Sequence, residues 1–249
     1  MLYQAHRGVS TEYPENTMPA FTAACDQGYL YIELDPGYTA DGEIVVLHDK
    51  TLNRTCRYPD GRELEEPTEI TQVTWAQVRE LDAGLWKGEQ FRGTSVPLLR
   101  DVLALAKERG AAVKIDNKIA RFPDEMLEKV FSLVEESGAD AAFTCTTDQM
   151  LQKIVSRFPK ATIHYDGNAE EWRLKEVAAQ LAENPLFIWV ALDTPLTAWV
   201  KIPKASPELC AAAKKYGKLG IWILHTEEEL RRAEALGADI IETTGSLKP

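Results

Sequence analysis

Short apolar runs alternate with longer amphipathic stretches from one end of the chain to the other. The runs have the length of buried strands, and the amphipathic stretches have the length and spacing of helices with one apolar face. The runs lie at residues 3–6, 30–35, 112–116, 141–145, 161–165, 187–191, 220–224 and 239–242, and the main helical stretches at 99–109, 124–137, 148–158, 170–184, 206–216 and 227–236. Eight strands that alternate with helices predict an α/β fold of the TIM (β/α)8 barrel type.

Residues that typically begin or end helices support several of these stretches. Thr226 precedes three consecutive glutamates, a pattern typical of a capped first turn. Gly110, Gly138, Gly217 and Gly237 each follow a helical stretch, where a left-handed terminal residue favours glycine. We therefore expect a left-handed turn at each of these four glycines.

A ninth apolar run, at residues 44–48, breaks the alternation. Only residues 40–43 separate it from the continuation of the second strand, which is too few for a crossover helix. Asp41 followed by Gly42 is a strong hairpin signal, so the run is predicted to fold back antiparallel on the second strand. This hairpin would return His48 toward the carboxyl end of that strand.

The segment after the hairpin has no strand–helix rhythm apart from a short helix predicted at residues 75–81. We therefore expect a single domain over residues 1–249. The hairpin and a small insertion after the second strand, together residues 40–97, would lie over the barrel mouth.

Composition narrows the range of partners. The chain has 249 residues, of which 45% are hydrophobic, so one sizeable core is feasible, and its net charge is −11. Such a charge argues against a nucleic-acid partner, because binding a phosphate backbone requires clustered Lys and Arg. An acidic protein with an anionic substrate must concentrate positive charge locally, in a metal or in a few side chains.

The cysteines and the apolar segments bear on the compartment. Cys25, Cys56, Cys145 and Cys210 are scattered without the spacing of a zinc site, which favours reduced, buried or half-buried thiols. No basic-then-apolar leader precedes the first strand, and no segment is long and apolar enough to span a bilayer. We expect a cytoplasmic protein without stable membrane association, and the sequence is silent on oligomeric state.

Charged side chains gather where the second and third strands end. Because strand side chains alternate between faces, Glu33 and Asp35 point the same way, and so do Lys114, Asp116 and Lys118. If these faces line the lumen, the charges lie at the carboxyl ends of the strands, where barrel active sites form. The alternative is an internal layer of salt bridges, which is often purely structural. The neighbouring turn with histidine and arginine favours function.

Glu33, Asp35 and Asp116 offer an all-oxygen site. Carboxylate ligands suit Mg²⁺ or Ca²⁺, whereas zinc usually recruits His or Cys, so we expect one divalent cation and leave its identity open. Such an ion can bridge phosphate oxygens and lower the pKa of a bound hydroxyl or water.

The remaining polar groups supply phosphate binding and proton transfer. Arg7 can grip a phosphate through its planar fork, and Lys118 can add a point charge. His6 and His48 form a candidate acid–base pair, in which either histidine could be the acid. These groups predict a metal-dependent phosphodiesterase. His225 could line the same mouth but has the pattern of a partly exposed loop residue.

Six motifs are spread along the chain: His6-Arg7-Gly8, Pro14-Glu15-Asn16-Thr17, Glu33-Leu34-Asp35, His48-Asp49 followed by Leu52, Arg54 and Thr55, Leu81-Asp82-Ala83-Gly84 with Trp86, and Val96-Pro97-Leu98-Leu99. Together they resemble the glycerophosphodiester phosphodiesterase family over nearly the whole chain. The resemblance implies a TIM barrel with a small insertion after the second strand. It also implies hydrolysis of small glycerophosphodiesters, such as glycerophosphocholine or glycerophosphoethanolamine, to glycerol 3-phosphate and an alcohol.

The resemblance further implies a divalent metal at Glu33, Asp35 and the third-strand carboxylate, with His6 and His48 catalytic. In the family mechanism the glycerol 2-hydroxyl attacks phosphorus, and water then opens the resulting cyclic phosphate.

The chain departs from the family pattern at three strand ends. Asp116 stands where the family usually has glutamate, and the segments that begin at Trp222 and at Glu242 also differ, so the roles of His225 and Glu242 stay open. Two alternatives remain. One is phospholipase D-like cleavage of a larger (lyso)phospholipid with a cyclic phosphate product. The sequence argues against it, because it has no amphipathic, Lys/Arg-rich helix to bind a membrane. The other is a non-catalytic phosphate-binding barrel, which would not need both histidines.

Overall fold

A closed parallel barrel forms the centre of the computed structural model, which describes residues 1–201 and 203–249. Its strands follow the order β1-β10-β9-β8-β7-β6-β5-β2. They are β1 (Leu2–Ala5), β2 (Tyr31–Leu34), β5 (Ala112–Ile115), β6 (Ala141–Cys145), β7 (Ile163–Tyr165), β8 (Leu186–Ala191), β9 (Lys218–Leu224) and β10 (Ile240–Thr243). Each overlaps a predicted run, so the predicted TIM barrel is confirmed.

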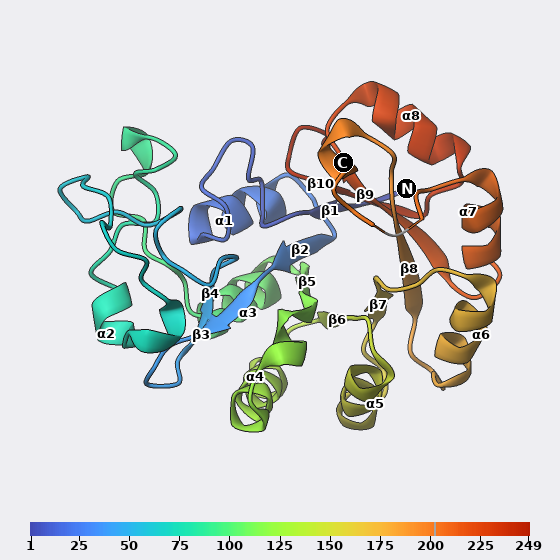
Figure 1. Ribbon diagram of the computed structural model, residues 1–249, viewed down its shortest axis with the longest axis horizontal. Helices are drawn as coiled ribbons and strands as arrows, with labels where there is room; N and C mark the ends of the chain where they lie inside the picture. Colours follow the sequence, from blue (N-terminus) through green and yellow to red (C-terminus); the bar gives the residue numbers. More distant parts are fainter. Residues whose placement is uncertain (202) are drawn as a thin grey trace.

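Helices surround the barrel (Figure 1). They are α1 (Met18–Asp26), α3 (Leu99–Arg109), α4 (Asp124–Ser137), α5 (Asp148–Arg157), α6 (Glu171–Ala179), α7 (Pro207–Ala213) and α8 (Glu227–Ala235). α3 and α4 have the predicted bounds. α6 ends five residues before the predicted 184, and the Asn184 amide instead donates to the carbonyl oxygens of Phe158 (3.1 Å) and Ala161 (2.8 Å).

The glycines that follow helices serve two different purposes. Gly110, Gly138 and Gly237 have left-handed φ angles of 68°, 59° and 77°, as predicted. The prediction for Gly217 is wrong, because its φ is not in the left-handed range. A Cβ atom there would lie 2.7 Å from the carbonyl oxygen of Leu186, so close approach to β8 is what requires glycine.

The barrel strands pack apolar side chains on both faces. Leu34 and Ile115 are fully buried in the main core, which includes side chains of the surrounding helices. A second cluster, made of Tyr31, Ala112, Ala142, Phe187, Trp189 and Ile240, fills the lumen. Tyr31 shares the face of Glu33, and Ala112 shares the face of Lys114. The lumen is therefore apolar toward the amino ends of the strands and charged toward their carboxyl ends.

The predicted hairpin is present, with one difference. The chain breaks at Asp35 into β2 and a short β3 (Pro36–Tyr38), and β3 pairs antiparallel with β4 (Ile44–Val46) in a separate two-stranded sheet. The run at 44–48 thus folds back on β3 and not on β2 itself. The amide of Leu47 donates to the carbonyl oxygen of Asp35 at 2.9 Å, which holds His48 beside the carboxyl end of β2.

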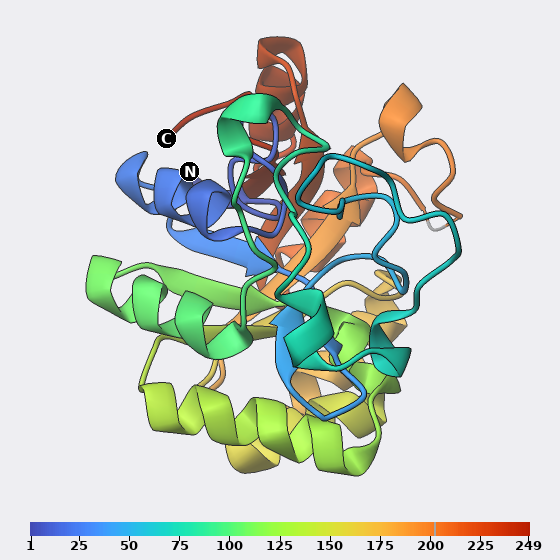
Figure 2. The ribbon, with the colours of Figure 1, turned by 90° about the vertical axis from the view of Figure 1, so that its left-hand side faces the viewer.

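The rest of the 40–97 segment consists of turns with three short helices: η1 (Ile70–Gln72), α2 (Trp75–Val78) and η2 (Glu89–Phe91). The predicted helix at 75–81 is present as the shorter α2. The segment lies beyond the end of β2 in Figure 1, and Figure 2, viewed from that side, places it in front of the barrel. Its apolar side chains, with Leu98, form a small core of their own: Val45, Leu47, Leu52, Cys56, Leu64, Ile70, Val78, Ala83 and Val96.

Two further predictions concern the chain as a whole. Cys25, Cys56, Cys145 and Cys210 are free thiols, three of them buried and Cys25 half-buried, as expected. None of the helices described in residues 1–201 and 203–249 combines the length and the hydropathy needed to cross a bilayer.

Candidate active site

Three carboxylates meet at the mouth of the barrel. Glu33 on β2 and Asp35 just beyond it are 3% and 2% exposed, and Asp116 follows β5 and is partly exposed. One oxygen of each lies within 4.8 Å of the others. β2 and β5 are neighbours with Glu33 opposite Lys114, so the alternation that predicted this trio is followed in the fold.

Asp35 is surrounded by donors. Its Oδ1 lies 2.7 Å from Lys118 Nζ, and its Oδ2 accepts a hydrogen bond from the Asn16 amide at 2.7 Å and lies 3.2 Å from Arg7 Nε. Burial alone would raise the pKa of Asp35, but Lys118, Arg7 and His48 outweigh it and hold that pKa far below its usual range. Asp35 is therefore ionised at any physiological pH.

Glu33 is in the opposite situation. Its Oε2 accepts a hydrogen bond from the Arg7 amide at 2.8 Å, but burial and then the nearby charges of Asp35 and Glu242 raise its pKa well above the ordinary value. An ionised Glu33 is therefore buried and faces the like charges of two neighbouring carboxylates. Clustered carboxylate oxygens of this kind fit a cation that prefers oxygen ligands.

His6 directly follows β1, at the same end of the barrel as the carboxylates. Its side chain is 19% exposed, and its Nε2 is 4.0 Å from Glu242 Oε1. The backbone is fixed on both sides, because the His6 amide donates to the Thr243 carbonyl at 2.8 Å and the Ser10 hydroxyl donates to the His6 carbonyl at 2.9 Å. Burial lowers the pKa of the imidazole despite the opposing charge of Glu242, which favours the neutral form.

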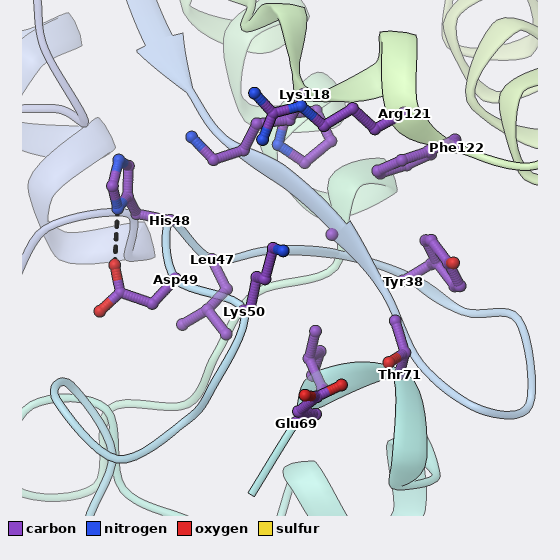
Figure 3. A pocket seen from close by; sticks show the side chains of 13 residues that line it. Tyr38, Leu47, His48, Asp49, Lys50, Glu69, Thr71, Lys118, Arg121 and Phe122 are labelled. Atoms are coloured by element: carbon purple, nitrogen blue, oxygen red, sulfur yellow. Dashed lines mark hydrogen bonds and ion pairs between the residues drawn. The ribbon is translucent and has the colours of Figure 1, made fainter. Parts of the chain in front are cut away.

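His48 belongs to an ion-pair network that joins the insertion to the loop after β1. Its Nδ1 lies 2.6 Å from Asp49 Oδ1, shown as a dashed line in Figure 3, and Arg54 Nε donates to the other oxygen of Asp49 at 2.5 Å. Arg54 Nη2 also donates to Glu15 Oε1 at 2.7 Å, and Arg7 Nη1 donates to the same oxygen at 2.9 Å. The network therefore connects Arg7 and His48, two of the residues that the sequence predicted to share one site.

Glu15 and Arg54 entered the sequence analysis only as parts of motifs. They are 39 positions apart, and no periodicity predicts that they meet. Asn16 was likewise named only within a motif, and its side-chain amide donates a hydrogen bond to Asp35.

The layer of internal salt bridges considered above is partly present. Lys118 pairs with Asp35 as that interpretation requires. Lys114 is different: it is 6% exposed in the lumen, and its Nζ lies 3.1 Å from Glu242 Oε2 and 4.4 Å from the centre of the Trp189 ring. Burial would lower the pKa of Lys114, but Glu242 and Glu33 raise it above its usual value. Barrel closure brings β10 within reach of β5, which a comparison of two strands alone could not predict.

The other histidines have separate environments. His164 is fully buried and accepts a hydrogen bond from Trp189 Nε1 at 2.9 Å, so it is the barrel-core residue expected from its mid-strand position. His225 is half-buried after β9, with Nδ1 3.2 Å from the Thr244 hydroxyl.

Comparison with known proteins connects this geometry to one family. The model of the glycerophosphoryl diester phosphodiesterase family matches residues 6–241. A protein named glycerophosphodiester phosphodiesterase from Caldanaerobacter subterraneus subsp. tengcongensis is 28% identical over 247 residues, which cover 96% of this chain and 92% of that relative.

Solved structures agree on the fold. A phosphodiesterase of Oleispira antarctica, in complex with the product sn-glycerol-3-phosphate, superimposes with a TM-score of 0.78 at 19% identity, covering 99% of this chain and 94% of that one. A glycerophosphodiester phosphodiesterase of Agrobacterium tumefaciens superimposes with a TM-score of 0.70 at 23% identity, covering 98% of this chain and 96% of that one.

Proposed function

The chain belongs to the glycerophosphoryl diester phosphodiesterase family, and we propose that it hydrolyses small glycerophosphodiesters to glycerol 3-phosphate and an alcohol with one divalent cation and two histidines. It is an enzyme of the phosphodiesterase class. The observation that carries the rest of the proposal is the position of Asp35. This carboxylate belongs to the acidic trio. It also lies close to both histidines, because its charge raises the pKa of His6 and His48 lowers the pKa of Asp35.

Glu33, Asp35 and Asp116 would hold the cation. When bound, it would neutralise charge on the phosphate and lower the pKa of a coordinated oxygen. Asp116 is one methylene shorter than the glutamate usual in the family, and the all-oxygen ligand set is compatible with either Mg²⁺ or Ca²⁺.

Lys118 and Arg7 would orient the phosphate. Lys118 is shared between Asp35, at 2.7 Å, and Asp116, at 3.6 Å, so its ammonium group lies at the edge of the acidic trio. Arg7 is held by Glu15 and Asp35, and the N–H groups that those contacts leave over can donate to a phosphate oxygen. Both cations are fixed before the substrate arrives, which reduces the entropic cost of ordering them.

We assign different roles to the two imidazoles from their different surroundings. His6 is favoured in the neutral form and would accept a proton from the attacking hydroxyl. The Nδ1 atom of His48 lies 2.6 Å from the Asp49 carboxylate, which orients the ring, and His48 would donate a proton to the departing oxygen.

These roles balance over a two-step reaction. The glycerol 2-hydroxyl loses its proton to His6 and bonds to phosphorus, while the bond to the alcohol breaks and that alcohol takes a proton from His48. Water then opens the cyclic phosphate with the histidines in reversed roles, which returns both to their starting protonation states. The sum is one water consumed for each diester cleaved.

The test is product analysis by phosphorus NMR with glycerophosphocholine and metal-loaded enzyme. The proposal expects glycerol 3-phosphate as the final product. It also expects His48→Ala to lower kcat by about 10²–10⁴-fold with an unchanged unfolding temperature. An accumulating cyclic phosphate would favour the phospholipase D-like alternative, and tight binding of glycerol 3-phosphate without any turnover would favour the binding-only barrel.

A further inference from the structure

A cleft of about 720 Å³ opens beside His48. It runs between the β3–β4 hairpin with the turn that follows it, η1, and η3 (Asn117–Arg121) (Figure 3). His48 and Lys118 line it, whereas His6, Glu33 and Asp35 do not. The cleft therefore extends from the His48 side of the reacting centre, away from the lumen, and its volume is within the usual range for a small-molecule pocket.

Its position relative to His48 determines which part of the substrate it can hold. In the function proposed above, on which this inference rests, His48 protonates the departing oxygen. The group attached to that oxygen must then extend from the His48 side of the phosphate. The cleft opens on this side of the phosphate, so it would receive the leaving alcohol. The glycerol moiety would stay near His6.

The charges that line the cleft are mainly positive and partly uncompensated. Lys50 and Arg121 are exposed, and no ion pair or hydrogen bond engages either side chain in the part of the chain that the structure describes. Arg121 follows Lys118 by three positions on η3, and in a 3₁₀ helix such residues share one face. Figure 3 shows Lys118 and Arg121 on the same wall, with Lys50 projecting between this wall and the one that carries Glu69.

The carboxylates of the cleft do not cancel this charge. Asp49 is already bound by His48 and Arg54, which leaves Glu69 on the wall opposite Arg121. The apolar part of the lining includes Tyr38 and Phe122, whose rings pack edge to face with their centroids 4.9 Å apart. Aromatic rings bind a quaternary ammonium group through their faces. Here Phe122 directly follows Arg121, so an ammonium group at this ring would lie in the same cleft as a guanidinium of like charge.

We propose that this cleft is the leaving-group subsite and that Lys50 and Arg121 select glycerophosphodiesters whose leaving alcohol carries its own anionic phosphate group. The protein has a net charge of −11, so most of its surface repels anions. Two unpaired cations beside Lys118 would attract an anionic leaving group locally. Diesters of choline and ethanolamine would still be cleaved, but without a contribution from these two side chains.

The experiment compares bis(glycerophospho)glycerol, whose leaving alcohol carries a phosphodiester, with glycerophosphocholine. We expect the double variant Lys50→Gln/Arg121→Gln to raise KM for the anionic diester roughly fivefold to tenfold, the scale of two solvent-exposed ion pairs. KM for glycerophosphocholine should change less than about twofold. Glu69→Gln removes the opposing carboxylate and should lower KM for the anionic diester.

The matched control is Lys160→Gln/Arg231→Gln, which removes the same charge from exposed positions outside the cleft lining. Equal KM changes in the two double variants, or equal changes for both substrates, would overturn the subsite while leaving the phosphodiesterase function intact. Absence of turnover with every substrate and metal would instead overturn the proposed function, and the subsite with it.

Discussion

The Nδ1 atom of His48 lies 2.6 Å from Oδ1 of Asp49, and the second oxygen of this carboxylate is bound by Arg54. The carboxylate thereby fixes the imidazole ring, and in the proposed mechanism Nε2 is the nitrogen that exchanges a proton with substrate. Because Arg54 is bound in turn to Glu15, the orientation of His48 depends on residues from two separate loops.

The first prediction concerns Asp49. Asp49→Asn keeps the shape of the side chain but replaces the carboxylate that orients the His48 ring, so kcat should fall by roughly 10–100-fold with little change in KM. Steady-state kinetics on glycerophosphocholine provide the measurement. Asp60→Asn, at an exposed carboxylate paired with Arg62, is the matched control and should have wild-type kinetics. Equal activity of the two variants would show that Asp49 does not support His48.

The second prediction concerns the stability of the metal-free protein. The pKa of Glu33 is raised in the folded state, so its contribution to stability is present at low pH and is lost as pH rises through the folded-state pKa. Glu33→Gln removes this loss. At pH 8 the metal-free variant should unfold about 3 °C or more above metal-free wild type, with the difference disappearing toward pH 4.

The same variant should bind Mg²⁺ or Ca²⁺ at least about tenfold more weakly by titration calorimetry, because one ligand has lost its charge. A Glu33→Gln protein that is less stable than wild type in EDTA, or that binds metal equally well, contradicts the assigned role of Glu33.

A third prediction follows from the lowered pKa of His6. A neutral base requires the acidic limb of kcat/KM, measured at saturating metal, to lie below about pH 6.5, the ordinary histidine value. Glu242 raises the pKa of His6 and Lys114 lowers it. Glu242→Gln should therefore move the limb to still lower pH, because it removes the first influence and strengthens the second. A limb that moves upward would exclude His6 as the titrating base.

The fourth prediction concerns the insertion. We propose that residues 40–97 belong to a single domain with the barrel. The amide of Val46 donates to the Pro97 carbonyl at 2.9 Å, the Leu47 amide donates to the Asp35 carbonyl at 2.9 Å, and Arg54 is bound to Glu15. Calorimetry should therefore record one unfolding transition in the metal-free protein. Two separate transitions, or proteolytic release of an intact barrel without the segment, would contradict a single domain.

The alternation of apolar and amphipathic segments was sufficient to predict the barrel, because each β–α unit carries its own periodicity. The acidic trio was also accessible from the sequence. Glu33 and Asp35 share one face of a strand, and Asp116 ends the strand beside it, so two local rules bring these three residues together.

Two sets of contacts that the sequence did not predict depend on distant segments of the chain meeting in the fold. Lys114 meets Glu242 because the last strand returns to complete the barrel, and Glu15 meets Arg54 because the insertion folds back on the loop after β1. Lys50 and Arg121 are ordinary surface cations in the sequence, and only the folded chain shows that they line one cleft between the hairpin and η3.

Metal-dependent hydrolysis is tested most directly by release of glycerol 3-phosphate from a panel of glycerophosphodiesters, with metal-stripped protein that is resupplied with Mg²⁺, Ca²⁺ or Mn²⁺. We expect no release without metal, restored release with at least one of these cations, and a loss of that restoration in Glu33→Gln. Full turnover by the stripped protein, or no turnover with any cation and any substrate, would contradict metal-dependent hydrolysis at this site.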